Sequence, residues 1–356
     1  MDSQTKKPNL EIPAINVSPT SKVLSIRISR RQILKASLFG AGALVAAAGG
    51  LAGLESLAAA PASLGRWRRL VPNTAPSPRS QAAIAYDGAR RAPVLFSGTT
   101  GDADTWTWNG ITWTRQSPPL SPPARSGASF AYHLPTQTLV LFGGMNAKGF
   151  LGDTWLWNGR TWIAVQGAGP PARIAASMAF DPVTSSLILF GGYGDGTLDD
   201  TWKWEGTAWR RLSPTSSPPP LAGASLAFSA AVGKLILFGG ERHATGAGGP
   251  ATTWTWDGIN WSELAFASSP SGRAFAAMAA DPAGRLILLF GGLANGSLLG
   301  DTWTLTSVWS ADTRSAAPPP RAYSSLVADP SSNSLLLFGG ESASGRMGDT
   351  WAWSTF

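Results

Sequence analysis

Five arginines and five aspartates recur along the chain in a fixed order, one arginine and then one aspartate in each of five copies of a repeated unit. The arginines are Arg79, Arg125, Arg173, Arg273 and Arg321, and the aspartates are Asp104, Asp153, Asp200, Asp301 and Asp349. If the guanidinium groups surrounded one opening, they would attract an anionic ligand. The alternative is that each arginine forms a structural ion pair with the aspartate of its own copy.

One copy of the repeat helps to decide between these two interpretations. Leu221 stands where this copy should have its arginine, and Thr252 stands where it should have its aspartate. A buried charge without its partner is costly, so a structural pair is expected to be lost as a unit. The joint loss therefore favours structural pairing, and ligand binding by the five arginines is the second hypothesis.

The same copy contains a second candidate site. Its connecting segment Glu241–Ala251 is longer than the others and holds Arg242 and His243 among glycines. Loops on a rigid scaffold often carry binding residues, so Arg242 and His243 are candidate ligand-binding residues. A glycine-rich connection without a binding role is the alternative.

No metal or cofactor site is predicted. The chain has no Cys, which excludes thiolate ligands and disulfides. Its two histidines, His133 and His243, are expected on opposite faces and cannot share a metal. Asp195, Asp199 and Asp200 could offer oxygen ligands to calcium, but their spacing follows no established loop pattern, and a solvated acidic loop is preferred. No Ser/His/Asp order and no phosphate-binding glycine loop is found.

The elements that position these residues are short strands and tight turns. The 356 residues include 41 Gly, 27 Pro and 17 Trp, which is typical of strands and turns rather than helices. The formal net charge is +7, but residues 1–35 contain seven basic and two acidic side chains and hold +5 of it. A nucleic-acid-binding protein carries its basic excess on the folded domain, so we predict no nucleic-acid partner.

Two signatures occur six times after residue 70. The first is an apolar strand that ends in Phe-Gly-Gly (Phe-Ser-Gly in the first copy), and its phenylalanines are Phe96, Phe142, Phe190, Phe238, Phe290 and Phe338. The second is Asp-Thr-Trp (Thr-Thr-Trp in the fourth copy), and its tryptophans are Trp106, Trp155, Trp202, Trp254, Trp303 and Trp351. In the third copy the pattern predicts four strands, over residues 175–180, 186–190, 201–204 and 209–212.

This period near 50 residues, with a Gly-Gly strand end and downstream tryptophans, resembles the kelch repeat, one four-stranded blade per copy. The resemblance extends over roughly residues 65–356. Within the kelch family, the repeats are similar to those of bacterial proteins that resemble the central domain of galactose oxidase. It implies an all-β, six-bladed kelch-type β-propeller over residues 63–356. The blades are expected at about 75–116, 122–165, 170–212, 219–264, 270–312 and 318–356, with a strand over 65–71 completing the last.

That last strand follows from the tryptophans. Sixteen of the 17 fall on the blade template, and Trp67 is the one left over. The segment Trp67-Arg68-Arg69-Leu70 repeats Trp209-Arg210-Arg211-Leu212, the outer strand of the third copy. The chain ends before the sixth copy has an outer strand, so we predict that residues 65–71 supply it and close the ring. Every tryptophan is thereby assigned to packing, and none is left for sugar binding.

The N-terminal segment resembles a twin-arginine export signal. Arg30-Arg31 precede an uncharged run from Ala36 to Leu54, and small residues follow at Ala58–Ala62. Residues 1–62 are thus predicted to be an export segment. The alternative is an uncleaved membrane anchor, since the run is long enough to span a bilayer. Both interpretations place the propeller outside the cytoplasm, and we expect it to be a monomer.

The predicted function is binding of a protein or glycan partner on one face of the propeller. The alternative is a cofactor-free carbohydrate-active enzyme, an epimerase or lyase, with its site at the axis. Copper-radical chemistry of the galactose oxidase type is excluded because it needs a tyrosine crosslinked to cysteine. A sialic-acid epimerase is another kelch enzyme, and no residue set here matches it. Fold alone does not decide between binding and catalysis.

Overall fold

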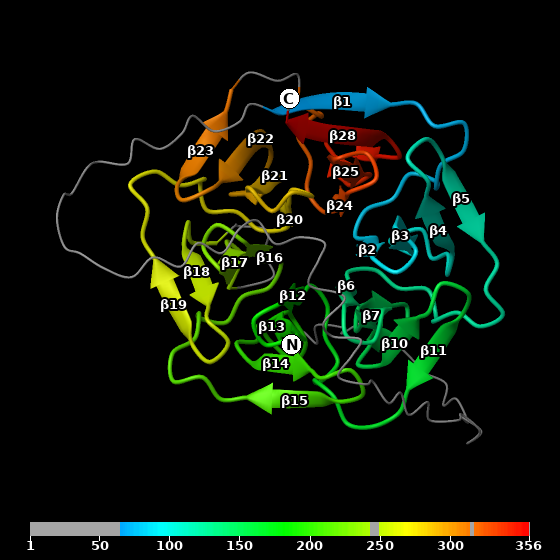
Figure 1. Cartoon of the computed structure of the whole chain (residues 1–356), viewed down its shortest axis with the longest axis horizontal. Helices are drawn as coiled ribbons and strands as arrows, with labels where there is room; N and C mark the ends of the chain where they lie inside the picture. The colour runs from blue at the N-terminus through cyan, green and yellow to red at the C-terminus, as the bar shows by residue number, and fades with distance from the viewer. Residues whose placement is uncertain (1–64, 243–248, 314–316, 356) are drawn as a thin grey trace, which may run out of the picture.

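The computed structural model describes residues 65–242, 249–313 and 317–355. Within these ranges the chain is all-β and contains no helix. It forms six four-stranded antiparallel sheets arranged as blades around a central axis (Figure 1). This confirms the predicted six-bladed propeller. The predicted export segment and His243 lie outside the described residues. The described part has no helix long and apolar enough to cross a membrane.

We name the strands of each blade a to d, from the axis outward. The six a strands are β2 (Ala83–Asp87), β6 (Ser129–His133), β12 (Ser177–Asp181), β16 (Ser225–Ser229), β20 (Ala277–Ala280) and β24 (Ser325–Asp329). The six b strands are β3 (Ala92–Phe96), β7 (Thr138–Phe142), β13 (Ser186–Phe190), β17 (Lys234–Phe238), β21 (Ile287–Ala294) and β25 (Ser334–Phe338).

The outer half of each blade is built in the same way. The six c strands are β4 (Thr105–Trp108), β10 (Thr154–Trp157), β14 (Thr201–Trp204), β18 (Thr253–Trp256), β22 (Ser297–Leu305) and β28 (Thr350–Thr355). The six d strands are β5 (Trp113–Gln116), β11 (Trp162–Val165), β15 (Trp209–Leu212), β19 (Trp261–Leu264), β23 (Trp309–Asp312) and β1 (Gly65–Leu70). Two b–c loops contain small hairpins, β8 (Met145–Asn146) with β9 (Gly149–Phe150), and β26 (Glu341–Ser342) with β27 (Gly345–Arg346).

The hydrophobic core lies between neighbouring blades rather than inside any one of them. Strand b is apolar on both faces because each face packs against a different neighbour; β13 is buried along its whole length. Six separate clusters result, and the cluster that contains Leu187 and Trp204 of blade three also contains Val140 and Phe142 of blade two. Each blade therefore depends on the next one for its stability.

The ring is closed by the N-terminal strand, as predicted from the sequence. Strand β1 pairs with β28 in an antiparallel register that places Trp67 opposite Trp353. The indole Nε1 of Trp67 donates a 2.9 Å hydrogen bond to Thr302 Oγ1 of blade five. Each of the other five d strands makes the same bond to the blade before it, for example Trp209 to Thr154. Trp67 therefore occupies the outer-strand position of blade six in its contacts as well as its pairing.

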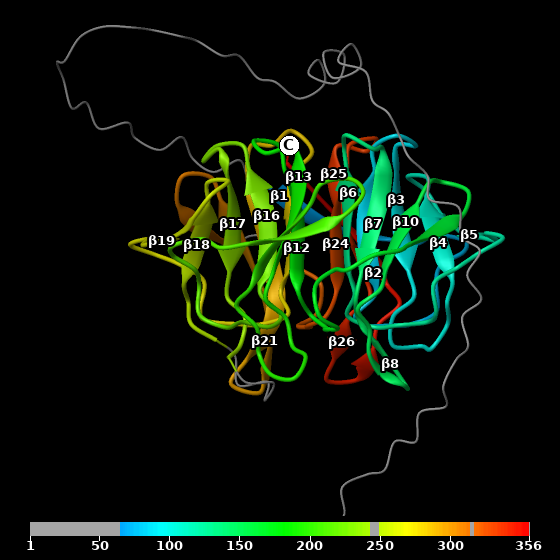
Figure 2. The same ribbon diagram turned by 90° about the horizontal axis from the view of Figure 1, so that it is seen from below.

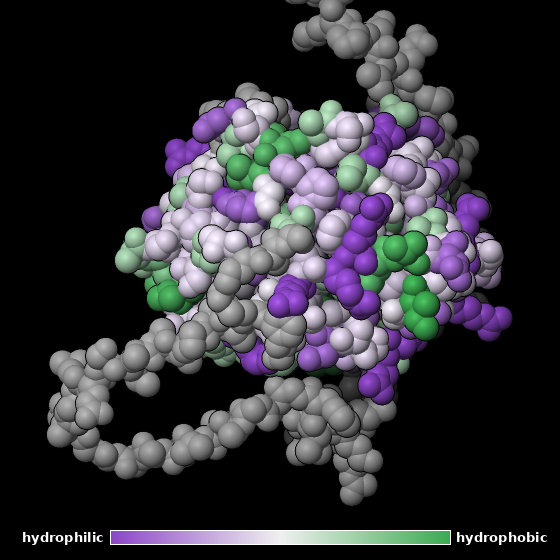
Figure 3. Space-filling model, turned by 90° about the horizontal axis from the view of Figure 1, so that it is seen from above, coloured by the Kyte–Doolittle hydropathy of each residue, from purple (hydrophilic) through white to green (hydrophobic). Residues whose placement is uncertain are grey.

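The two ends of the propeller differ in their connections. The b–c loops and the d–a connections form one end, which we call the loop face, and the a–b and c–d turns form the other, the turn face. The hairpins labelled β8 and β26 and the C-terminus lie at opposite ends in Figure 2. Because Gly65 pairs with Thr355 at the end of β28, the described chain begins at the turn face. The side wall in Figure 3 mixes hydrophilic residues with small, separate hydrophobic patches.

The start of one strand differs from the expectation by two residues. The innermost strand of the third blade was predicted to begin at Ala175, but β12 begins at Ser177. Ala175 has a positive φ of 57°, which no β-strand residue adopts, and its N–H donates to Gly127 of the neighbouring blade. This hydrogen bond of Ala175 is one of a ring of contacts around the axis, described below.

Candidate functional site

The five arginines and five aspartates that recur in the sequence meet inside their own blades. In blade three the Arg173 guanidinium donates to both carboxylate oxygens of Asp200 at 2.5 and 2.8 Å and to the carbonyl of Gly191 at 2.9 Å. The same two-pronged contact joins the other four pairs. The arginine side chains are buried, with at most 1% of each exposed. None of these arginines lines the axial cavity described below.

The five carboxylates are kept ionised by their partners. Burial by itself would raise the pKa of Asp200, but hydrogen bonds from Arg173 and from Trp202 Nε1, together with the Arg173 charge, lower this pKa below its ordinary value. The pKa values of Asp104, Asp153, Asp301 and Asp349 are lowered in the same way. A paired, hydrogen-bonded carboxylate of this kind is poorly suited to proton transfer.

The arginine backbone also joins one blade to the blade before it. Arg173 N–H donates to the Leu151 carbonyl at 3.0 Å, and Gly144 N–H donates to the Arg173 carbonyl at 2.8 Å. An added Cβ at Gly143 would lie 2.7 Å from that same carbonyl, so the glycine pair permits the close approach of the two blades. The side chain thus fixes its own blade and the main chain fixes the preceding one.

Blade four keeps the backbone contacts and lacks the ion pair. Leu221 N–H donates to the Leu198 carbonyl, and Gly192 N–H donates to the Leu221 carbonyl, as in the other blades. The Leu221 side chain is buried in the apolar cluster between blades three and four. Without an aspartate at position 252, the buried Thr252 Oγ1 and Trp254 Nε1 have no hydrogen-bond partner.

Two residues after each arginine position, the six blades meet in a closed ring of backbone hydrogen bonds. Each residue of this axial ring donates its N–H to the carbonyl of the equivalent residue in the preceding blade, at 2.7–3.0 Å. All six have positive φ, between 56° and 65°. The ring consists of Gln81, Gly127, Ala175, Gly223, Phe275 and Tyr323.

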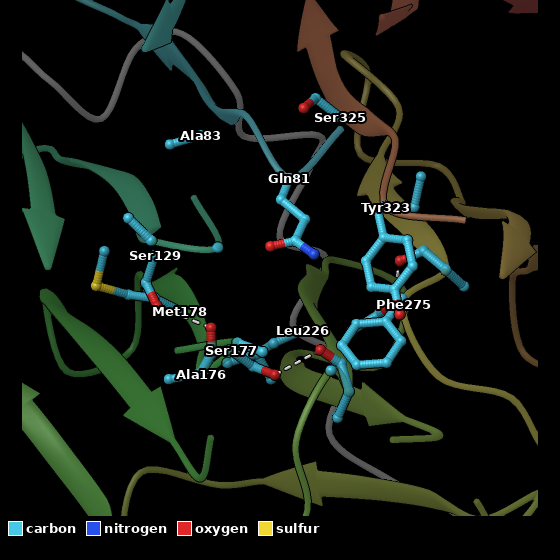
Figure 4. Close-up of a pocket in the computed structure, with 18 of the residues that line it drawn as sticks. Gln81, Ala83, Ser129, Ala176, Ser177, Met178, Leu226, Phe275, Tyr323 and Ser325 are labelled. Carbon is cyan, nitrogen blue, oxygen red and sulfur yellow. Dashed lines mark hydrogen bonds between the residues drawn. The ribbon is translucent and has the colours of Figure 1, made fainter. Parts of the chain in front are cut away.

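The side chains of the axial ring are not equivalent. In blades two, three and four they are a hydrogen or a methyl group. In blades one, five and six they are Gln81, Phe275 and Tyr323, which point toward one another in Figure 4. The Phe275 and Tyr323 rings are stacked with centroids 4.4 Å apart and an angle of 33° between their planes. The Phe275 ring also covers Gly223, where an added Cβ would lie 2.3 Å from it.

Bulky side chains at these positions carry a conformational cost. Glycine adopts positive φ freely, whereas an aromatic residue in this region is a true outlier and costs on the order of 1–3 kcal/mol. Gly127 and Gly223 adopt the same backbone without that cost. Because strained residues gather at functional sites, Phe275 and Tyr323 mark the axis as the candidate site.

The axial ring lines a cavity of about 410 Å³ that occupies the propeller axis at the loop face. Its wall consists mainly of small and apolar side chains at the starts of the six a strands. Several wall hydroxyls are already used, since Ser129 and Ser177 donate to carbonyls of the next blade (Figure 4). This volume suits a small molecule or a single side chain of a partner.

Two residues from b–c loops complete the wall. Tyr193 and Glu241 each follow a glycine pair and are held by a backbone bridge to the neighbouring residue of the d–a connection, Ile174 and Ala222 respectively. The Glu241 side chain is buried. Burial and then the charges of Glu241 and Glu341 raise the pKa of the Tyr323 phenol, so this group stays protonated at neutral pH.

Among the described residues, the binding and metal-ligand candidates predicted from the sequence do not line the cavity. Arg242 is exposed on the loop face next to Glu241, where its carbonyl accepts a 2.7 Å hydrogen bond from Thr197, but it does not line the cavity. Asp200 is used in the pair with Arg173, while Asp195 and Asp199 are not grouped with a third possible ligand in the described chain. His133 lies on the turn face, buried beside Thr136.

Sequence reasoning missed Gln81, Phe275, Tyr323 and Glu241. A usable signal was present, because Gly127 and Gly223 stand at the positions where blades one, five and six carry large side chains. A glycine position that other copies fill with an aromatic residue suggests that the side chain serves something other than the fold.

Together, the blade architecture, the glycine pairs and the c-strand tryptophans define a kelch-type propeller. The chain belongs to the kelch-repeat family, since residues 60–240 match the KLHDC2/KLHL20/DRC7 Kelch-repeats domain. No curated protein matches the chain. Among solved structures it is similar to that of YjhT, with a TM-score of 0.61 and 18% identity over 78% of this chain and 95% of that one. That likeness shows a common fold.

Proposed function

We propose that this protein is an exported interaction module that binds a protein or glycan partner on its loop face, with the axial cavity as the centre of the contact. Kelch propellers commonly serve as interaction modules. The observation that carries the proposal is the pair Phe275 and Tyr323, whose side chains line a cavity from backbone positions that favour glycine. Nothing in the packing of the blades requires aromatic rings there, because glycine occupies the same position in two other blades.

Export gives this site a consistent orientation. The predicted export segment or anchor precedes Gly65, which lies at the turn face, whereas the cavity lies at the loop face. An uncleaved segment would therefore hold the propeller with its cavity directed away from the membrane. Detection of the full-length protein in the cytoplasmic fraction alone would contradict the export part of this proposal.

The binding part is tested with a Phe275→Gly/Tyr323→Gly double variant. Glycine suits the positive φ at both positions, so the variant is expected to fold. The purified protein is screened by thermal shift against acidic sugars, cell-wall fragments and amino compounds. A ligand of the cavity should raise the melting temperature of the wild type and not that of the variant.

Ala175→Gly is the matched control for this experiment. It changes a residue of the same axial ring with the same backbone conformation but removes only a methyl group. Ligand shifts should be the same in this variant as in the wild type. If every ligand shift survives in the double variant, the partner binds elsewhere and the cavity is not the site.

The enzyme alternative receives less support. General acid–base catalysis needs groups that reach a common point within about 3 Å. Among the described residues that line the cavity, Glu241 is the one carboxylate, and the Tyr323 phenol has a raised pKa. The five aspartates of the Asp-Thr-Trp signature are paired with arginine. A wall of mainly small and apolar groups favours binding over catalysis.

A further inference from the structure

We propose that the axial cavity accepts an organic cation: an ammonium group carried by a small molecule or by a side chain of a protein ligand. The positive group would lie against Phe275 and Tyr323 and close to the carboxylate of Glu241. This inference rests on the proposed function and deepens it by naming the charge and chemical class of the ligand. Four features of the described residues support it.

The first feature is the charge of the cavity wall. Glu241 is the one charged side chain among the described residues that line the cavity, and it is buried. No arginine, lysine or histidine is among these residues. A buried carboxylate interacts more strongly with a cation than an exposed one, because the surroundings screen its charge less.

The second feature is the aromatic pair. The faces of aromatic rings carry negative partial charge and attract cations within about 6 Å of the ring centroid, ammonium groups in particular. Both residues line the cavity, and because their rings are stacked on one another, a cation would contact the outer face of the pair. Gln81 also lines the cavity and lies beside them in Figure 4, with its amide nitrogen on the side of Tyr323.

The third feature is that an anion would find few hydrogen-bond donors. Six backbone N–H groups surround the axis and would otherwise form a natural anion site. All six donate to carbonyls within the axial ring. The five recurring arginines are likewise occupied by their aspartates and buried away from the cavity. An acidic sugar therefore meets no free positive group among the described residues of the wall.

The fourth feature is the charge of the loop face around the cavity. Outside the five ion pairs, the described residues of the b–c loops carry an excess of negative charge, although the whole chain is basic. The acidic side chains are Asp102, Asp195, Asp199, Glu241 and Glu341, against Lys148, Arg242 and Arg346. Such a surface favours the approach of a cation.

The experiment compares choline with dimethylbutanol, a neutral molecule of the same shape, by calorimetric titration of the purified full-length protein. Choline should bind, and the neutral molecule should bind at least about tenfold more weakly, because only the charge differs. Glu241→Gln should reduce the affinity for choline about tenfold. Glu263→Gln is the matched control, since Glu263 is exposed on β19, the outer strand of blade four, and does not line the cavity; it should change the affinity less than about twofold.

A second arm separates the two sources of the cation. Short peptides with a central lysine or trimethyllysine are titrated alongside choline. Tighter binding of a peptide than of choline indicates a protein ligand, and the reverse indicates a small molecule; either result supports the proposal. Equal binding of choline and dimethylbutanol, or the absence of binding by every ammonium probe at about 10 mM, would overturn it.

The two proposals fail in different ways. If the ammonium probes do not bind but another ligand shifts the wild type and not Phe275→Gly/Tyr323→Gly, the cavity is a binding site for a different chemical class. If no ligand depends on the two aromatic residues, the proposed function fails as well.

Discussion

Two sets of equivalent positions, one at the axis and one farther out in the blades, repeat around this propeller in opposite ways. The arginine–aspartate pairs repeat both their side chains and their contacts in five of the six blades. The axial ring repeats its backbone in all six blades, with the same φ and the same hydrogen bond, but its side chains range from glycine to tyrosine. The two sets lie only two residues apart in the sequence.

This difference separates structure from function within one molecule. Where identical side chains make identical contacts in each copy, the fold itself requires them. Where the backbone is constant and the side chains differ, the fold requires only the backbone, and the side chain is available for another purpose. On this view the arginines stabilise the blades, and Phe275 and Tyr323 serve the ligand.

The largest expected effect concerns the arginine–aspartate pairs. Arg173→Leu should lower the free energy of unfolding by about 3–5 kcal/mol, because it leaves the Asp200 carboxylate inside the protein without its partner. The double variant Arg173→Leu/Asp200→Thr reproduces the residues of blade four and should cost clearly less than the single variant. Denaturant unfolding measures both. This pair is suited to the test because both of its side chains are largely buried.

Additive costs would contradict the pairing hypothesis. They would mean that Arg173 and Asp200 stabilise the blade independently, and the joint loss in blade four would need another explanation. Chemical denaturation at two salt concentrations provides a control, since a buried pair is screened much less by salt than an exposed one.

The repeated features could be predicted from the sequence because each blade needs the same residue types at the same positions, so the pattern occurs several times. Six strand ends of the Phe-Gly-Gly or Phe-Ser-Gly type and six c-strand tryptophans indicated the number of blades, and the unassigned Trp67 indicated how the ring closes. Hydrophobic patterns set these elements locally. The axial ring could not be predicted in this way, because its hydrogen bonds join residues roughly 50 positions apart and depend on positive φ at residues such as Phe275. Nothing in the local pattern of an aromatic residue indicates that conformation.

A residue that differs between copies does not always mark a binding site, and His133 is an example. His133 occupies the place of Asp87, Asp181, Asp281 and Asp329 in other blades, but it is buried at the turn face. Burial lowers the pKa of His133 to about 4. The unfolded chain, with a histidine pKa near 6.5, therefore binds a proton that the folded protein rejects.

Protonation of His133 in the unfolded chain makes the folded protein less stable as the pH falls. The contribution of His133 is fully present above pH 6.5 and is lost as the pH falls toward about 4, at a total cost of about 3 kcal/mol. In His133→Asn this part of the pH dependence should disappear, while ligand binding at the loop face stays unchanged. Unfolding curves at several pH values between 7 and 4 measure the effect. The five paired aspartates do not interfere, because their lowered pKa values confine their loss of stability to lower pH, near and below 4. An unchanged slope in His133→Asn would assign the pH dependence to other groups.

The smallest expected effect lies in the axial ring and tests the comparison most directly. Ala175→Gly removes a methyl group from a residue with φ of 57° and should raise stability slightly, by up to about 1 kcal/mol, because glycine adopts this conformation without strain. Phe275→Gly relieves about 1–3 kcal/mol of strain but loses the contact with Tyr323, worth about 0.5–1.5 kcal/mol, and adds about 0.5–1 kcal/mol of backbone entropy cost, so its net change should be close to zero.

A core phenylalanine of the blades offers the contrast: Phe190→Ala should cost about 3–5 kcal/mol, since Phe190 is fully buried between blades three and four. If Phe275→Gly destabilised the protein as much as Phe190→Ala, the aromatic pair would be part of the core, and the distinction between the two sets of positions would be lost. A nearly unchanged stability combined with the loss of ligand binding would instead identify Phe275 as a residue retained for function at the expense of local strain.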